Sequence, residues 1–226
     1  SSAASDVYKR QVVYRCLLKE TPILSDELLA DYYVGYREKE VKFADAAELL
    51  NDSDAVFIVE ATGERRRTKD EILSCFTVRQ ALKPYENIRM GEEIWIYEPT
   101  TVFFLDTSLN NEELYERSVP HHVIINKHIS LDSVHIPMRS GRQYLVCLKL
   151  FRKPEGYRYS EREKRTFLLT DPNSSQFRTD REIQNYVPQG ETKITFQNLA
   201  QYDCMMNEQD FSKYVFLYEE MVKFLK

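Results

Sequence analysis

The sequence predicts a mainly β fold, a small antiparallel barrel with helices at its flanks. Several short segments rich in β-branched and aromatic residues follow one another closely between residues 54 and 151. Helical periodicity is strongest near the ends of the chain, and only 6 of the 226 residues are glycine. Because 42% of the residues are hydrophobic, the chain can bury a core, and its length suits one large domain, with or without appendages.

The first 42 residues divide into two parts. Residues 1–11 are small, polar and aperiodic, and we interpret them as a fusion or sequence-assembly remnant. Residues 12–42 form an N-terminal segment that begins with an apolar run at 12–18. This run is interpreted either as the end of a missing signal peptide or membrane anchor, or as an ordinary first strand or helical turn. A short helix is expected near residues 25–33, capped by Ser25 or Asp26.

A single domain is expected over residues 43–226. It begins with a short amphipathic helix at 43–50, and a strand at 54–62 that ends at Gly63 follows. A charged turn is expected over residues 64–70. The next strand, 72–82, alternates, with Phe76 and Val78 on one face and Cys75 and Thr77 on the other.

The rest of the domain contains further strands, an insertion and a terminal helix. The expected strands are 93–98, 144–151, 166–169 and 193–196. Between the first two of them, residues 100–140 are interpreted as an insertion. An amphipathic helix over 207–226, capped by Asn207, is expected to dock on the barrel.

The order of these signals between residues 43 and 151 resembles a known pattern. The matching segments are Asn51-Asp52-Ser53-Asp54 before a Val-rich strand, Phe76-Thr77-Val78, Leu82-Lys83-Pro84, Gly91-Glu92-Glu93-Ile94-Trp95-Ile96, and Gly141-Arg142-Gln143-Tyr144-Leu145-Val146. They are similar to extracytoplasmic proteins of Gram-positive bacteria and, more remotely, to the netrin-like module of tissue inhibitors of metalloproteinases. The resemblance implies an OB-like five-stranded barrel that serves as a binding scaffold. Those inhibitors act through an N-terminal Cys-x-Cys, which is absent from this sequence, so protease inhibition is not implied.

One basic cluster is a candidate ligand-binding site. Arg65, Arg66, Arg67 and Lys69 stand in the expected charged turn, where they could contact the backbone of a nucleic acid or of an anionic glycan. Asp70 and Glu71 follow directly and offset the charge, so a solvated turn explains the cluster equally well.

The histidines suggest a second candidate site. His121, His122, His128 and His135 lie within fifteen positions, and we name His121, His128 and His135 as possible metal ligands. Adjacent strand residues point to opposite faces, so His121 and His122 do not easily share an ion. The sequence contains no His-x-x-x-His helix, and histidines in loops and at strand edges are the simpler interpretation. No cofactor is expected.

The sequence offers no convincing catalytic constellation. It lacks a Gly-x-Ser-x-Gly elbow and a phosphate-binding loop, and its four cysteines have no zinc-ribbon or Cys-x-x-Cys spacing. Cys75 and Cys147 lie in expected strands, each as a small buried side chain or as half of a disulfide. The net charge of −5 gives no strong signal for nucleic-acid binding.

These observations favour a non-catalytic binding or structural module at the bacterial cell surface. We expect an extracytoplasmic location, membrane-anchored or secreted, and a protein or a cell-envelope polymer as partner. Two alternatives remain, a metal-dependent hydrolase that uses the histidine-containing insertion and an intracellular module that binds single-stranded nucleic acid through the barrel face. The sequence does not indicate the ligand or the oligomeric state.

Overall fold

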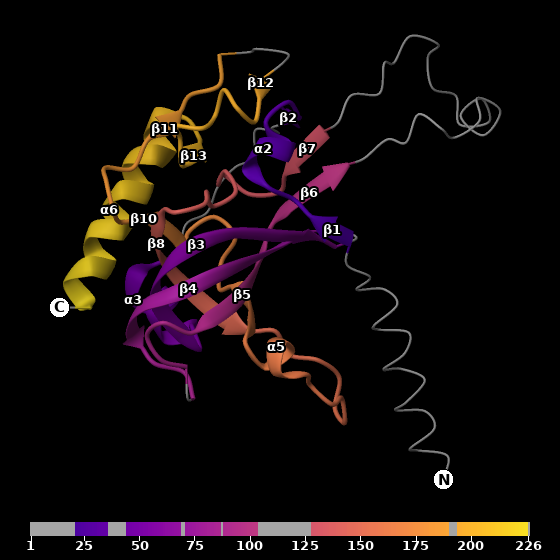
Figure 1. Ribbon diagram of the computed structural model, residues 1–226. Coiled ribbons are helices and arrows are strands. Elements are labelled where there is room, and N and C mark those ends of the chain that lie inside the picture. The colour runs from indigo at the N-terminus through magenta and orange to yellow at the C-terminus, as the bar shows by residue number, and fades with distance from the viewer. Residues whose placement is uncertain are drawn as a thin grey trace.

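The computed structural model describes residues 21–35, 44–68, 71–86, 88–103, 128–189 and 194–225. Five strands form the central barrel (Figure 1). They are β3 (Ala55–Arg67), β4 (Ile72–Lys83), β5 (Glu93–Glu98), β8 (Gln143–Leu150) and β9 (Thr166–Leu169). Their order around the barrel is β3-β4-β5-β9-β8, and the pairing of β8 with β3 closes it. The expected fold class, mainly β with a small barrel and a C-terminal helix, is therefore confirmed.

The barrel differs from the expectation in one detail, because it is not antiparallel throughout. Four of its pairings are antiparallel, whereas β5 and β9 run parallel, with Ile96 opposite Phe167. A closed ring with an odd number of strands cannot alternate direction at every pairing, so a five-stranded barrel requires at least one parallel pair. Periodicity along single strands contains no information about this constraint.

Alternate side chains of the five strands fill the barrel. The interior cluster includes Phe57, Phe76, Ile94, Val146 and Phe167, all fully buried. Phe76 and Val78 point inward while Cys75 belongs to an outer cluster, as the alternation of this strand predicted. The rings of Phe57 and Phe167 meet edge to face with centroids 6.3 Å apart.

The strand that was expected to end at Gly63 instead continues to Arg67. The register between β3 and β4 shifts between Ala61 and Arg65, which identifies a bulge at this point. Gly63 allows the bulge because it adopts a left-handed backbone with φ of +88°. The chain therefore bends at Gly63 without leaving the sheet, and the expected charged turn is mostly strand.

A second sheet covers one end of the barrel. Its order is β12 (Ile194–Thr195), β2 (Tyr33–Gly35), β7 (His128–Leu131) and β6 (Thr100–Phe103). The expected insertion thus contributes β6 and β7, and β7 pairs with β2 from the N-terminal segment. Buried side chains from all of these parts share one cluster that includes Tyr32, Val102, Ile129 and Phe196. Residues 21–35 therefore belong to the same folded unit as the barrel.

Short elements of the N-terminal segment complete this end. β1 (Thr21–Ile23) pairs with the end of β3, and α2 (Asp26–Leu29) is capped by the Ser25 side chain, which accepts from Leu28 N–H. The helix expected over residues 25–33 is therefore a single turn that gives way to β2. Tertiary pairing of Tyr33–Gly35 with β7 overrides the local helical pattern.

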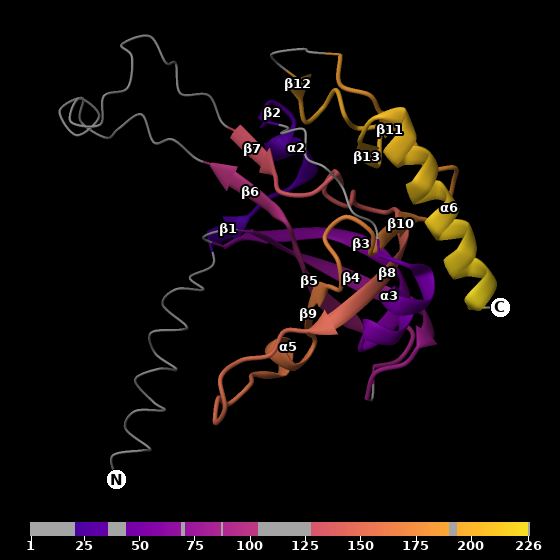
Figure 2. The same cartoon turned by 180° about the vertical axis from the view of Figure 1, so that it is seen from behind.

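Helices cover one side of the barrel. α6 (Glu208–Phe224) runs along it in Figures 1 and 2, beside α3 (Ala46–Asp52) and β10 (Gln176–Arg178). Tyr214, Leu217 and Met221 are buried in the cluster that these elements form with the outer face of β8. Asn207 caps α6 and accepts from Asp210 N–H at 2.9 Å, as predicted.

The remaining elements are small. β11 (Asn185–Tyr186) and β13 (Cys204–Met205) form a parallel pair, and α5 (Glu161–Lys164) lies in the connection between β8 and β9. This connection projects from the end of the barrel opposite the second sheet (Figure 2). Within the parts of the chain that the structure describes, no helix combines the length and apolarity that a bilayer span requires.

Candidate functional site

The basic run of residues 65–67 does not form a single patch. All three arginines lie in β3, where successive side chains point to opposite faces. Arg65 is buried at the end of the barrel, whereas Arg66 lies on the outside, half exposed. Arg67 pairs with Ile72 at the end of the strand, and Lys69 lies outside the described residues. The run thus contributes to two separate environments on the two sides of β3.

On the outside of the barrel, Trp95 is flanked by two guanidinium groups. The centre of the Arg66 guanidinium is 5.3 Å from the Trp95 ring centroid, and that of Arg162 is 5.5 Å away. Both distances are within the range of cation–π attraction. Glu64 also holds Arg66, through a hydrogen bond of 2.9 Å. The ring itself is largely buried.

Aromatic residues extend this region toward the β8–β9 connection. Tyr97 and Phe151 pack with ring centroids 5.0 Å apart, in the same outer cluster as Trp95. We call the surface formed by Arg66, Trp95, Tyr97, Phe151 and Arg162 the tryptophan face. It combines cationic groups with rigid aromatic support, a combination suited to anionic groups carried on a chain.

The connection of residues 151–165 is held in one conformation by a buried ion pair. The Lys153 ammonium contacts the Glu163 carboxylate, and its side chain is almost fully buried. Tyr157 donates to the same carboxylate at 2.6 Å, and Tyr159 Oη accepts from Lys153 N–H at 2.8 Å. Glu163 and Ser160 also form a capping box at the start of α5. These contacts position α5, and with it Arg162.

The electrostatics of Glu163 agree with this geometry. Burial alone would raise the pKa of its carboxyl group. Hydrogen bonds from Lys153, Tyr157 and Ser160 to the carboxylate outweigh burial and lower the pKa to about 2. The carboxylate that orders the connection is therefore charged over the whole physiological pH range.

On the other side of β3, Arg65 closes the end of the barrel. It forms an ion pair with Asp26 of α2 and donates to the carbonyl oxygen of Met138. The buried carboxylate of Glu98 accepts from Ser74 Oγ and, at 2.7 Å, from Met138 N–H. Burial raises the pKa of Glu98, although Arg65 and these hydrogen bonds oppose the shift. These polar groups join the barrel, α2 and the segment that leads into β8.

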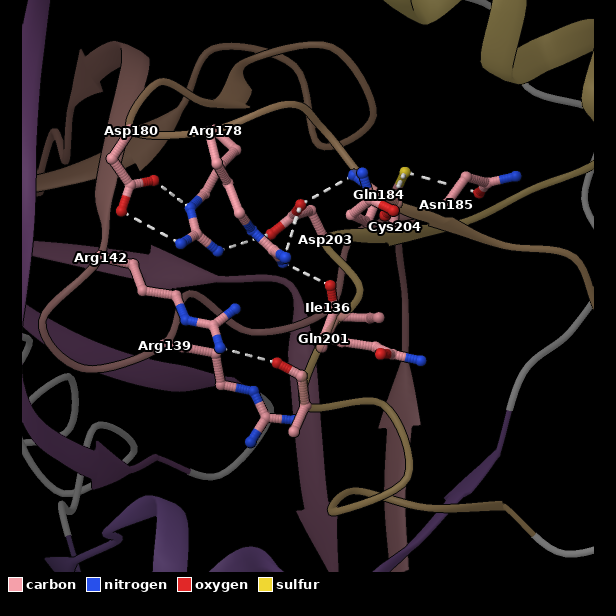
Figure 3. Close-up of polar contacts among 12 residues, drawn as sticks. Ile136, Arg139, Arg142, Arg178, Asp180, Gln184, Asn185, Gln201, Asp203 and Cys204 are labelled. Carbon is pink, nitrogen blue, oxygen red and sulfur yellow. Dashed lines mark hydrogen bonds and ion pairs between the residues drawn. The ribbon is translucent and has the colours of Figure 1, made fainter.

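A second set of arginines fastens the C-terminal segment to the barrel (Figure 3). Arg178 of β10 contacts both carboxylate oxygens of Asp180 and reaches Asp203 at 3.1 Å. Asp203 also accepts from Gln184 N–H at 2.9 Å, and Arg181 lies 3.6 Å from it. Every carboxylate of this group thus has an arginine partner, which indicates a structural role for Arg178 and Arg181.

The predicted metal ligands are not brought together. His121 and His122 lie outside the described residues, and the backbone of His128 pairs with Tyr33 and Phe103 in the second sheet. His135 is buried, with its ring 5.3 Å from that of Tyr214. Among the residues whose placement is described, no group of three His, Cys, Asp or Glu side chains could hold a metal ion. A metal site that uses His121 stays a prediction.

The three cysteines in the described ranges, Cys75, Cys147 and Cys204, are free and buried. Cys75 and Cys147 point outward from the barrel into different clusters, under the tryptophan face and under α6. Burial raises the pKa of Cys75 to about 11 and that of Cys147 to about 12. Of the two alternatives for these residues, the small buried side chain is therefore the one found, and both thiols are poor nucleophiles.

Sequence reasoning identified Arg66 but missed its partners. Trp95 was recognised only as a strand residue, and Arg162 was not singled out. The sole tryptophan in an outward-facing strand position was the available signal. Comparison of the chain with protein-family models and with curated protein sequences gives no match.

Proposed function

We propose that the protein is a non-catalytic binding module of the bacterial cell surface that holds a strand of an anionic envelope polymer on the tryptophan face. The observation that carries the proposal is the placement of the Arg66 and Arg162 guanidiniums over the Trp95 ring. Stacking on the ring limits the freedom of both arginines, so less entropy is lost when they bind an anion.

The architecture supports this site. In OB-like barrels, ligands bind across the second and third strands and the loops after the first and fourth. The corresponding strands are β4 and β5, and the loop after the fourth strand is the connection of residues 151–165. The tryptophan face lies on the outer side of these strands. The buried Lys153–Glu163 pair holds the connection ready for binding, as expected of a preformed site.

Guanidinium groups favour phosphate and carboxylate groups, which they can bind through two parallel hydrogen bonds. A polymer that repeats such groups could contact Arg66 and Arg162 with successive units. The extracytoplasmic location that we propose would place the module beside polymers of this kind.

The proposal can be tested by titrating the protein with a purified phosphodiester-linked polyol polymer. Replacing Arg66 and Arg162 together by alanine should weaken binding about tenfold or more, because two charge-assisted contacts are lost. The matched control is Lys213→Ala with Lys223→Ala, which removes the same charge from the exposed side of α6. The control should bind like the unaltered protein.

Two outcomes would overturn the proposal. Equal loss in both double variants would mean that overall charge, not the tryptophan face, drives binding. Binding of a single-stranded oligonucleotide with steep salt dependence, without binding of the polymer, would favour the nucleic-acid alternative.

A further inference from the structure

Glu64 is placed beside Arg66 by the bulge in β3. The two residues are separated by one position, so their side chains project from the same face of the strand. The hydroxyl group of Thr62 fixes the backbone of the bulge, because it accepts from Glu64 N–H at 3.2 Å and donates to the carbonyl oxygen of Cys75 at 3.0 Å. The Glu64 carboxylate is therefore held on the outer face of the barrel, at the edge of the tryptophan face.

The Glu64 carboxylate occupies one edge of the Arg66 guanidinium. A single carboxylate oxygen, Oε1, accepts from Nη2 at 2.9 Å and from Nε at 3.3 Å. These two N–H groups form one of the forks through which a guanidinium binds a phosphate or a carboxylate group. An anionic ligand that uses this fork must therefore take the place of Glu64.

Both partners of this ion pair are accessible to solvent. The side chain of Arg66 is 34% exposed and that of Glu64 is 37% exposed. An ion pair in such a position contributes little to stability, because water solvates both charges when the pair opens. Exchange of the Glu64 carboxylate for another anion at Arg66 therefore requires neither unfolding nor the burial of a bare charge.

The Trp95 ring holds Arg66 independently of Glu64. The centre of the guanidinium is 5.3 Å from the centroid of the ring, within the range of cation–π attraction. The ring is only 7% exposed, and its strand pairs with β4 on one side and β9 on the other. The support under Arg66 is therefore fixed, and the guanidinium keeps its place when the carboxylate leaves.

We propose that Glu64 is a built-in competitor of the ligand, which holds the fork of Arg66 in the free protein and is displaced by one anionic group of the polymer. This inference rests on the proposed function. When only a fraction of a protein is competent to bind, its affinity for the ligand is reduced by that fraction. Glu64 thus sets the affinity of the tryptophan face below the value that the arginines alone would give.

A purely positioning role of Glu64 would have the opposite effect on binding. If the carboxylate only oriented the Arg66 guanidinium for the ligand, its removal would cost affinity. If it competes with the ligand, its removal strengthens binding, because the fork is then open and a negative charge beside the ligand is gone. The direction of the change therefore distinguishes the two roles.

The same strand contains a matched control. Glu60 binds Arg79 in a similar way, with Arg79 Nε donating to Oε2 at 3.0 Å and Nη2 lying 3.0 Å from Oε1. The groups near Glu60 include Gln143 of β8 and Asp180, and neither belongs to the tryptophan face. Glu60→Gln therefore removes the same charge from an equally accessible ion pair outside the proposed site.

The experiment is a calorimetric titration of the intact protein with the phosphodiester-linked polyol polymer at one fixed ionic strength. Glu64→Gln should bind the polymer about threefold or more tightly than the unaltered protein. Glu60→Gln should stay within about twofold of it. When Arg66 is already replaced by alanine, Glu64→Gln should change the affinity no more than Glu60→Gln does, because no fork is left for the carboxylate to occupy.

Three results would overturn this inference: unchanged or weaker binding in Glu64→Gln, equal tightening in Glu60→Gln, or tightening by Glu64→Gln that persists without Arg66. Each of them leaves the proposed function standing, provided that the double variant of Arg66 and Arg162 loses binding. Absence of polymer binding by the unaltered protein and by Glu64→Gln alike would instead refute the proposed function, and the competitor role with it.

Discussion

Two glycines of the barrel, Gly63 and Gly91, have the same left-handed backbone but different surroundings. Their φ angles are +88° and +90°. A Cβ atom on Gly63 would lie 2.7 Å from Ser140 Oγ and 3.1 Å from Ser140 Cβ, whereas a Cβ atom on Gly91 would meet nothing within 4 Å. Comparing alanine substitutions at the two glycines therefore separates the cost of backbone strain from the cost of close packing.

Alanine at Gly91 should lower the free energy of unfolding by about 1–2 kcal/mol through the left-handed backbone alone. Alanine at Gly63 should cost about 1 kcal/mol more, because the turn at Ser140 must move away. Chemical denaturation measures both. The extra loss should disappear when Gly63→Ala is combined with Ser140→Gly, and equal losses at the two glycines would contradict the close approach.

His135 should make the protein less stable in mild acid. Burial lowers the pKa of its imidazole to about 4, although a hydrogen bond with the Asn173 backbone opposes the shift. In the unfolded chain the pKa of a histidine is about 6.5. Between these values the unfolded chain binds a proton that the folded chain does not, so stability falls as the pH decreases. His135→Phe should remove this contribution, which is about 3 kcal/mol once the pH is below 4.

The measurement is the difference in unfolding free energy between His135→Phe and the unaltered protein at several pH values from 8 to 4. The difference should be nearly constant above pH 7 and should change in favour of the variant below about 6.5. A difference that does not depend on pH would mean that folding does not shift the pKa of His135.

At the level of elements, α6 presents two neighbouring residues in opposite environments. Leu217 is 5% exposed and packs in the cluster under the helix, whereas Phe216 is 61% exposed. Phe216 and Phe224 border a groove of about 520 Å³ between α6 and the start of α3. The buried side of the helix contains Tyr214, Leu217 and Met221.

Leu217→Ala should lower the free energy of unfolding by about 2–5 kcal/mol, since it leaves a cavity in the core. Phe216→Ala should change it by no more than about 0.5 kcal/mol, because the ring is on the surface. Urea denaturation of the two variants provides the comparison. A large loss for Phe216→Ala would mean that this face of α6 is covered in solution.

Across the whole molecule, the Asp26–Arg65 ion pair links α2, at the end of the barrel that the second sheet covers, to β3 of the barrel. Asp26→Asn would leave Arg65 buried without its carboxylate and should cost about 3 kcal/mol. The exposed Glu60–Arg79 pair is the matched control, and Glu60→Gln should cost less than about 1 kcal/mol.

Trp95, the sole tryptophan, reports on the barrel by fluorescence, while far-ultraviolet circular dichroism reports on the whole chain. In Asp26→Asn, the unfolding midpoints measured by the two signals should shift together, because the polar network joins the second sheet to the barrel. An early transition that leaves the tryptophan signal unchanged would show that the second sheet unfolds separately from the barrel.

The sequence by itself determined most strands of the barrel, the faces of residues 75–78, and the capped start of the C-terminal helix. These features depend on alternation, periodicity and caps, which act between residues a few positions apart. Only the tertiary structure decided the parallel β5–β9 pair, the continuation of β3 past Gly63, and the separation of Arg65 from Arg66. It alone placed Arg162 beside Trp95 and brought Arg139 and Arg142 to the carbonyl groups of Phe196 and Ala200. Barrel closure and burial bring together residues far apart in the chain, and no local pattern contains that information.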